Sequence, residues 1–384
     1  MRKKKTKTSK KKASRRAAPA SRKTKAARTS RKSAAAAERP LPATQRPAPV
    51  IAPVLPPHRP PAAKRQSKAP PAILIMGPTA SGKTALAVEL VKQLPCEIIS
   101  VDSAQLYKGM NVGTGKPGPE VLSRAPHHLL DIIEPHESYS AARFRDDALT
   151  LMREITERER IPLLVGGTML YFKALIEGLS ELPEADPVIR LVIDTMAEQE
   201  GWPAVHAKLG RVDPETAARL DPNDAQRIQR AMEVYSITNK PMSELLRKPR
   251  YVYFPYTAFK IALVPGDREV LHERIARRFQ AMLDAGLVAE LKGLREEYGL
   301  EAGMPSMRCV GYRQAWEHLE GRLGADALRE EGIAATRQLA KRQLTWLRAM
   351  DGVTEFDCLA DDLPQMVLEY LRHELEALVV AGEA

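Results

Sequence analysis

Short apolar runs alternate with amphipathic helical segments between residues 71 and 185. The run Ile73-Leu-Ile-Met76 is bounded by proline and glycine, as is typical of a buried strand, and a helical pattern follows it. A longer helix is predicted to begin at the capping residue Ser140. The predicted elements in chain order are a strand at 73–76, a helix at 85–94, strands at 96–103 and 127–133, a helix at 140–160 and a strand at 161–168.

Strands and helices that alternate in this way favour an α/β fold, in which a parallel sheet carries helices on both faces. Ligands of such sheets bind at the carboxyl ends of the strands. Gly77–Thr84, Asp102 and Thr168 all lie at such ends. Three segments that are far apart in sequence are therefore expected to converge on one pocket.

Residues 186–250 interrupt this alternation. Their pattern is helical, with turn or capping signals at Asp186-Pro187, Asp213-Pro214 and Asp221-Pro222. A strand returns at Phe259–Val264, and helices are predicted from there to the end of the chain. The pattern thus predicts a core made of residues 71–185 and 251–384, with an all-helical insertion domain at 186–250.

Charge divides the chain near residue 70. Residues 1–70 hold 22 lysines and arginines against one acid, Glu38, which gives a net charge of +21, whereas the remainder carries −10. This segment also holds 11 of the 30 prolines and no aromatic residue, so we predict a disordered basic tail. Its lysine runs are typical of an arm that attracts nucleic acid without reading its sequence.

Cysteine usage and hydropathy bear on the cellular setting. The three cysteines, Cys96, Cys309 and Cys358, are far apart and form no zinc or redox motif, which favours a reducing cytoplasm. The chain has no run of 18 apolar residues, so no membrane span is expected. A cytoplasmic protein that acts as a monomer is the simplest prediction.

One phosphate-binding motif is strong. Gly77–Thr84 fit the spacing G-x-x-x-x-G-K-[ST] between a predicted strand and a predicted helix, which indicates a P-loop NTPase-like fold. The two glycines allow consecutive N–H groups to point at one anion, and the positive end of the helix favours that anion as well. Lys83 adds a charge, and the Thr84 hydroxyl is suited to bind Mg²⁺. The predicted phosphate-binding residues are Gly77, Pro78, Thr79, Ala80, Ser81, Gly82, Lys83 and Thr84.

The other strand ends bear on the type of reaction. Many P-loop hydrolases place an acid after a later strand to organise Mg²⁺ and water, but the strand at 161–168 ends in Gly166, Gly167 and Thr168. Asp102 is the acid that ends the strand after the P-loop helix. It is a candidate base, and the pattern alone leaves two alternatives open, a Mg²⁺ second-shell ligand and a helix cap.

Seven blocks in order resemble the bacterial tRNA dimethylallyltransferases, also called tRNA isopentenyltransferases, over about residues 72 to 350. The blocks read GPTASGKT at 77–84, DSAQLYKGMNVGTGKP at 102–117, HHLLDI at 127–132, IPLLVGGTMLYFKAL at 161–175, NDAQRIQRAMEV at 223–234, MRCVGYRQAW at 307–316 and ATRQLAKRQLTWLR at 335–348. Gly115 stands where alanine is common in the family, and the basic tail lies outside the resemblance.

The resemblance implies an activity and assigns roles. The family transfers a dimethylallyl group from dimethylallyl diphosphate to the exocyclic N6 amine of the adenosine 3′-adjacent to the anticodon in tRNAs. By resemblance, the P-loop holds the donor's diphosphate with Mg²⁺ on Thr84, Asp102 is the general base, and Thr168 holds a diphosphate or bridging oxygen. Lys83, Asp102 and Thr168 are thus the expected catalytic residues.

The same resemblance implies several tRNA contacts. Tyr312 and its neighbouring arginines suit base stacking and phosphate contact, whereas Trp346 and Leu347 are expected to point into the core. The insertion is expected to contact the anticodon stem-loop, and the pattern of Gln226–Arg230 alone leaves a solvated charged helix face open as the alternative. The predicted tRNA-binding residues are Asp102, Ser103, Ala104, Gln105, Thr168, Arg190, Gln226, Arg227, Ile228, Gln229, Arg230, Arg308, Cys309, Val310, Gly311, Tyr312, Arg313, Lys341, Arg342, Gln343, Leu344, Thr345, Trp346, Leu347 and Arg348.

Three other functions fit part of the pattern. A P-loop kinase shares the loop and the strand-end acid but has no need of the arginine-containing blocks. An isopentenyltransferase acting on a free nucleotide shares the chemistry, although the long C-terminal half argues against it. An RNA-binding NTPase module would require nucleotide hydrolysis.

Overall fold

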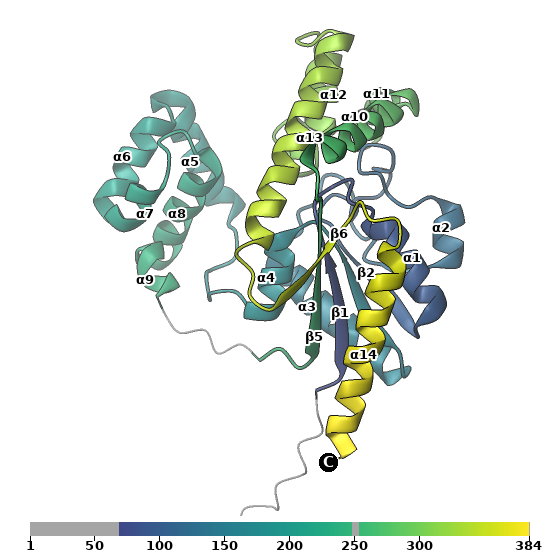
Figure 1. Ribbon diagram of the computed structural model, residues 1–384. Coiled ribbons are helices and arrows are strands. Elements are labelled where there is room, and N and C mark those ends of the chain that lie inside the picture. The colour runs from purple at the N-terminus through teal and green to yellow at the C-terminus, as the bar shows by residue number, and fades with distance from the viewer. Residues whose placement is uncertain (1–68, 248–252, 384) are drawn as a thin grey trace, which may run out of the picture. The chain divides into compact units, whose positions relative to one another are not determined.

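The computed structural model describes residues 69–247 and 253–383, so the predicted basic tail lies almost entirely outside the described residues. A six-stranded sheet has the spatial order β3-β2-β4-β1-β5-β6, and all neighbouring strands in it are parallel. The predicted parallel sheet flanked by helices is confirmed (Figure 1). The strands are β1 Pro71–Met76, β2 Cys96–Val101, β3 His127–His128, β4 Ile161–Gly166, β5 Thr257–Val264 and β6 Val353–Asp357.

Alternate residues of the central strands enter two separate apolar cores, because successive strand side chains point to opposite faces. In β1, Ile73 and Ile75 enter one core, and Leu74 and Met76 enter the other. Helices α1 and α14 cover the first face and lie side by side (Figure 1). The helices of the core are α1 Lys83–Gln93, α2 Pro119–Arg124, α3 Ala141–Glu157, α4 Met169–Glu177, α10 Arg268–Asp284, α11 Leu287–Tyr298, α12 Tyr312–Leu319, α13 Ala325–Leu347 and α14 Leu363–Glu383, and a 3₁₀ helix spans Ser306–Arg308.

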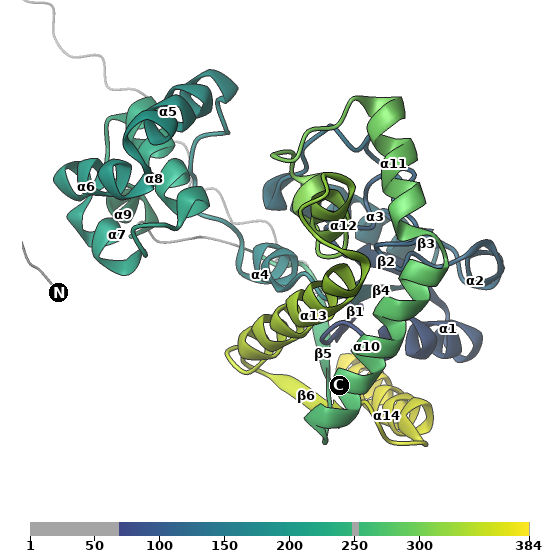
Figure 2. The same cartoon turned by 90° about the horizontal axis from the view of Figure 1, so that it is seen from above.

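The second face is covered by helices from both halves of the sequence. Helix α3 contributes Phe144 and Met152 to this core, and α4 contributes Phe172. From the C-terminal half, α10 to α13 pack on the same face, and α10 and α13 are seen from above in Figure 2. Ser140 caps α3 as predicted, since its Oγ accepts the Arg143 N–H at 3.1 Å.

Two strands differ from the prediction. β3 is only two residues long, because Leu129 and Asp131 adopt left-handed φ values of 61° and 51° that end the extended chain. The prediction of helices after residue 264 is confirmed by α10 to α14, but it missed β6, which pairs with β5 at the sheet edge. Only Phe356 of its five residues is large and aromatic, and polar residues alternate with it, so the strand lacks the apolar run that identifies a central strand.

Residues 187–246 contain helices and turns, as the sequence predicts. The helices are α5 Pro187–Glu200, α6 Trp202–Val212, α7 Pro214–Arg219, α8 Ala225–Thr238 and α9 Met242–Leu246. They pack on one another around two small cores, which include Ile193, Val205 and Leu209. Asp186 and Asp213 cap α5 and α7 with their carboxylates. Within the described residues, no helix is long and apolar enough to cross a bilayer.

Candidate active site at the carboxyl ends of the strands

The P-loop joins β1 to α1 in a tight turn. Ala80 and Gly82 have left-handed φ values of 65° and 84°, and such backbone strain on a non-glycine residue is typical of ligand-binding loops. A Cβ at Gly77 would lie 2.8 Å from Ser81 Oγ and 3.1 Å from the Leu263 carbonyl oxygen, so glycine is needed beneath the loop. Lys83 opens α1, and its Nζ donates to the Pro78 carbonyl at 2.6 Å.

A cavity of about 660 Å³ opens where this loop meets the carboxyl ends of β2 and β4. The predicted convergence of Gly77–Thr84, Asp102 and Thr168 on one pocket is confirmed. Gly77, Pro78 and Ser81 are buried and do not line it. The sequence-predicted residues that line the cavity are Thr79, Ala80, Gly82, Lys83, Thr84, Asp102, Ser103, Ala104, Gln105, Thr168, Arg308, Cys309, Val310, Arg342, Gln343 and Trp346.

Asp102 and Thr168 follow two neighbouring strands of the sheet. Asp102 Oδ1 accepts the Ala104 N–H at 2.9 Å and closes the turn after β2, but it is not the helix cap that the sequence left open, because the next helix, α2, begins at Pro119. Thr168 Oγ1 accepts the Ser103 N–H at 2.9 Å and donates to Ser103 Oγ at 3.3 Å. These contacts fix Asp102, Ser103 and Thr168 relative to one another on one wall of the cavity.

Five charged side chains line the cavity: Lys83, Asp102, Arg278 of α10, Arg308 and Arg342. Burial lowers the pKa of Lys83 to about 8, while Asp102 raises it and Arg278 lowers it further. Burial likewise lowers the pKa of Arg278, against the opposite effect of Asp102. Four basic side chains thus share the cavity with one carboxylate, and two of them, Lys83 and Arg278, are desolvated, so the site is suited to an anion that carries more than one charge.

Arg278 is a site residue that the sequence analysis missed. It donates from Nη2 to the Thr114 carbonyl at 3.4 Å. A Cβ at Gly115 would lie 2.0 Å from this Nη2, and Gly115 has a φ of 59°, so glycine leaves room for the guanidinium group. Gly115, in a segment that the P-loop motif does not include, was the one signal in the sequence that could have pointed to a close neighbour here.

Gln343 has a different role from the predicted tRNA contact. Its Oε1 accepts the Thr79 N–H and its Nε2 donates to the Gly167 carbonyl, both at 2.9 Å. The amide is nearly buried and joins the P-loop to the end of β4. Gln343 thus connects α13 to both phosphate-site segments rather than presenting its amide to RNA.

Several other predictions in the C-terminal blocks are corrected. Tyr312 is fully buried, and its hydroxyl donates to Glu290 at 2.5 Å, so it cannot stack on an RNA base. Leu344 is buried too, whereas Trp346 is 40% exposed and lines the cavity, with Lys173 Nζ 5.7 Å from its ring centroid. Leu347 is buried as predicted. Gly311 is buried as well, and Arg313, Lys341, Thr345 and Arg348 are exposed outside the cavity.

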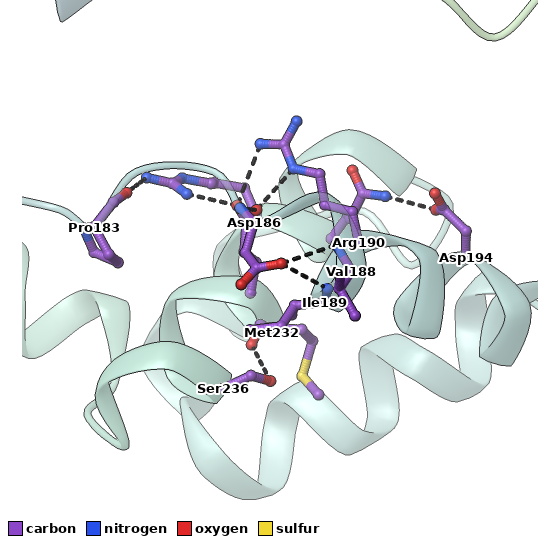
Figure 3. Close-up of polar contacts among 11 residues, drawn as sticks. Pro183, Asp186, Val188, Ile189, Arg190, Asp194, Met232 and Ser236 are labelled. Atoms are coloured by element: carbon purple, nitrogen blue, oxygen red, sulfur yellow. Dashed lines mark hydrogen bonds and ion pairs between the residues drawn. The ribbon is translucent and has the colours of Figure 1, made fainter.

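Arg190 and Arg230, two predicted tRNA contacts in the insertion, hold a buried carboxylate. Glu233 is fully buried and pairs with Arg190 at 2.8 Å and with Arg230 at 2.5 Å. It also accepts the Asp186 N–H at 2.9 Å, and Arg230 donates to the Pro183 carbonyl at 2.6 Å (Figure 3). Burial raises the pKa of Glu233, but these hydrogen bonds outweigh it and lower the pKa overall.

The other predicted contacts of α8 separate by exposure. Ile228 is fully buried in the insertion core, so its side chain cannot touch RNA. Gln229 Nε2 donates to Asp194 Oδ1 at 2.6 Å, whereas Gln226 and Arg227 are exposed. Arg227 and Arg230 line a second cavity, of about 350 Å³, together with Arg219.

Comparison with known proteins identifies the family. The family model described as IPP transferase matches residues 105–350. The protein named tRNA dimethylallyltransferase from Nitrosospira multiformis is 61% identical over 79% of this chain and 94% of its own length. The protein of that name from Thiobacillus denitrificans is 60% identical over 77% of this chain and 94% of its own length.

Solved structures agree with this match. The full-length tRNA isopentenylpyrophosphate transferase from Bacillus halodurans aligns with a TM-score of 0.60 and 35% identity, over 82% of this chain and 99% of that one. A eukaryotic dimethylallyltransferase acting on tRNA aligns with a TM-score of 0.62 and 26% identity, over 75% of this chain and 74% of that one. From sequence and fold together, the chain belongs to the IPP transferase family.

Proposed function

We propose that the protein transfers the dimethylallyl group of dimethylallyl diphosphate to the exocyclic N6 amine of the adenosine 3′-adjacent to the anticodon in tRNAs. The names of its relatives support this activity. The observation in the structure that carries the proposal is one cavity that is lined by the P-loop, by Asp102 and by many apolar and aromatic side chains. Among these side chains are Tyr107, Tyr139, Met169, Tyr171, Ile275, Phe279 and Met282, which are called the apolar wall below.

The donor's two ends match two parts of this cavity. The diphosphate would lie at the P-loop, where Lys83 and Arg278 offset the negative charge that grows as the C–O bond breaks. The five-carbon chain would lie on the apolar wall, which also keeps water from the allylic centre.

Asp102 is the proposed general base. The amine nitrogen forms a bond to the allylic carbon, the carbon–oxygen bond breaks and diphosphate leaves, and one amine proton passes to the carboxylate. The adenosine must leave its stack to reach this position at the cavity wall. Ser103 and Thr168, which bond to each other beside Asp102, would orient the substrates there.

Mg²⁺ is the proposed cofactor. No cluster of three histidine, cysteine or acidic side chains among the described residues could hold a metal by itself. Mg²⁺ commonly binds through one or two protein oxygens together with substrate phosphates, and the Thr84 hydroxyl on the cavity wall fits that mode. The ion would neutralise charge on the leaving diphosphate.

The acceptor distinguishes this activity from its rivals. The protein is incubated with radiolabelled dimethylallyl diphosphate and either unmodified tRNA, AMP or ATP. We expect label in tRNA only. Label in AMP or ATP would indicate an enzyme that acts on free nucleotides, and ATP hydrolysis or phosphate transfer without prenylation would indicate an NTPase or a kinase.

Donor capture should weaken as the pH rises through about 8, because Lys83 loses its charge there. The folded pKa lies below the ordinary value, so the cation is present below pH 8 and is lost above it. The pH profile of kcat/KM for the donor reports groups of the free enzyme and measures this limb directly. Lys83→Arg keeps its charge at these pH values, so its kcat/KM should no longer fall as the pH rises. A flat wild-type profile between pH 7 and 9.5 would contradict the assignment.

Arg227→Ala and Arg230→Ala should have different effects. Arg227 is exposed and pairs only with Asp224 among the described residues, so its loss should raise KM for tRNA about fivefold and leave melting unchanged. Arg230 neutralises the buried Glu233, and its loss should lower the free energy of unfolding by about 2 kcal/mol. Thermal melts beside steady-state kinetics measure both effects. A higher KM for the donor in Arg227→Ala would argue against tRNA contact.

Removal of residues 1–70 should weaken tRNA binding at low salt. The segment carries a net charge of +21, and each phosphate that it neutralises releases counterions. The slope of log affinity against log salt should therefore become shallower, while turnover at saturating tRNA stays the same. Filter binding across a salt series measures the slope, and an unchanged slope would exclude RNA contact by this segment.

A further inference from the structure

Glu290 of α11 accepts an unusual number of hydrogen bonds, although it does not line the cavity. Its carboxylate accepts three consecutive backbone N–H groups, from Asn111 at 3.0 Å, Val112 at 2.8 Å and Gly113 at 3.3 Å. The fourth donor is the buried hydroxyl of Tyr312, at 2.5 Å. A carboxylate suits four donors because it only accepts, whereas an amide would direct its own N–H groups at some of them.

The loop held by Glu290 forms part of the proposed donor site. Gly113, Thr114 and Gly115 line the cavity, and the Thr114 carbonyl accepts from Arg278. The loop lies close against its support, since a Cβ at Gly113 would lie 2.5 Å from both Leu287 and Tyr312. This loop therefore gives the Arg278 guanidinium a hydrogen-bond acceptor at Thr114 and a close contact at Gly115.

Tyr312 connects the same carboxylate to a second wall of the cavity. It begins α12, and only Gly311 separates it from the segment 308–310, which lines the cavity. Burial and the hydrogen bond to Glu290 raise the pKa of Tyr312, so the phenol stays a donor at every ordinary pH. One carboxylate thus joins the loop 111–115 to the start of α12, although neither Glu290 nor Tyr312 lines the cavity.

We propose that Glu290 and Tyr312 are positioning residues that hold loop 111–115 with Arg278, and segment 308–310, in the relative placement that prenyl transfer requires. This inference rests on the proposed function. The pair acts through the residues it holds, since neither side chain reaches the reacting atoms. A shift of about 1 Å in such groups can cost on the order of 100-fold in rate.

The test uses Glu290→Gln, Tyr312→Phe and the double variant of the full chain. We expect each single variant to lower the single-turnover rate, at saturating donor and tRNA, at least about fivefold. Because both substitutions remove one shared contact, the single-turnover rate of the double variant should be within about twofold of the rate of the slower single variant. If the fold-loss in rate of the double variant equals the product of the two single losses, the two residues act independently and the proposal is overturned.

Matched controls separate positioning from stability. Glu296→Gln changes an exposed acid on the same helix as Glu290. Tyr370→Phe removes a hydroxyl that accepts a hydrogen bond from Thr354 and belongs to α14, not to the helices that hold the pair. Both should keep the wild-type rate. Test variants that melt at lower temperature but lose less than fivefold in rate would reduce the pair to a packing role and overturn the proposal. If Glu290→Gln does not fold, Tyr312→Phe decides alone.

A second readout keeps this inference distinct from the activity itself. If the wild-type protein transfers no label to tRNA, the proposed function fails. Calorimetric binding of inorganic diphosphate with Mg²⁺ then tests the pair without the reaction. We expect both variants to bind diphosphate at least about threefold more weakly because Arg278 is displaced, and unchanged binding in that case would overturn the inference.

Discussion

Lys83→Ala should lower turnover at least about 100-fold. Removal of one preorganised contact to the charge that develops in the transition state typically costs about 3 kcal/mol. Lys83 lies at the start of α1 and is the P-loop's own side-chain cation in the cavity. The cations that the variant leaves on the cavity wall are Arg278, Arg308 and Arg342, which lie on other segments. Single-turnover transfer of radiolabel to tRNA measures the effect, and a loss below tenfold would remove Lys83 from the catalytic charges.

The melting temperature should not fall in the same variant. Burial lowers the pKa of Lys83, which means that keeping its charge in the folded protein costs free energy at neutral pH. Alanine removes this cost together with the bond to the Pro78 carbonyl. Lys92→Ala, on the last turn of the same helix, is the matched control because that side chain is exposed, and it should change neither rate nor melting.

Sequence predicted the parts of the site that obey local rules. The P-loop spacing, the strand before it and the acid after β2 are each encoded within a few residues. The rule that ligands bind at the carboxyl ends of parallel strands then placed Asp102 and Thr168 beside the loop, and the structure confirms that placement.

Contacts between distant residues could not be predicted in this way. Arg278, Glu290 and Gln343 each contact loop segments more than 160 residues away, and nothing in their local pattern distinguishes them from other charged or polar helix residues. Their roles depend on how α10, α11 and α13 pack over the sheet. That packing follows from the whole fold rather than from a motif.

Aromatic and charged residues on helices were the least predictable. Tyr312 was expected at the RNA surface but is buried, because its hydroxyl donates to Glu290. Trp346 was expected in the core but lies on the cavity side of α13. Arginines of the insertion were read as RNA contacts, yet Arg230 and Glu233 stand three residues apart on one helix face. That spacing is a readable sign of a structural ion pair.

Asp102→Asn should lower turnover by roughly 10²- to 10⁴-fold, the usual loss on removal of a general base. Asparagine keeps the shape and can still accept the Ala104 N–H through its Oδ1, so the turn after β2 should persist. Asp102 also raises the pKa of Lys83, so the comparison is made at a pH well below that pKa, where both substrates should bind with near-normal affinity. If Asp102 instead served mainly to hold Mg²⁺, donor binding would weaken and added Mg²⁺ would partly restore the rate. Donor and tRNA affinities measured across a Mg²⁺ series, beside single-turnover rates, separate the two roles. Rescue by metal together with weak donor binding would exclude the base role and leave the diphosphate assigned to the P-loop, because the loop and not this carboxylate provides the anion-binding groups.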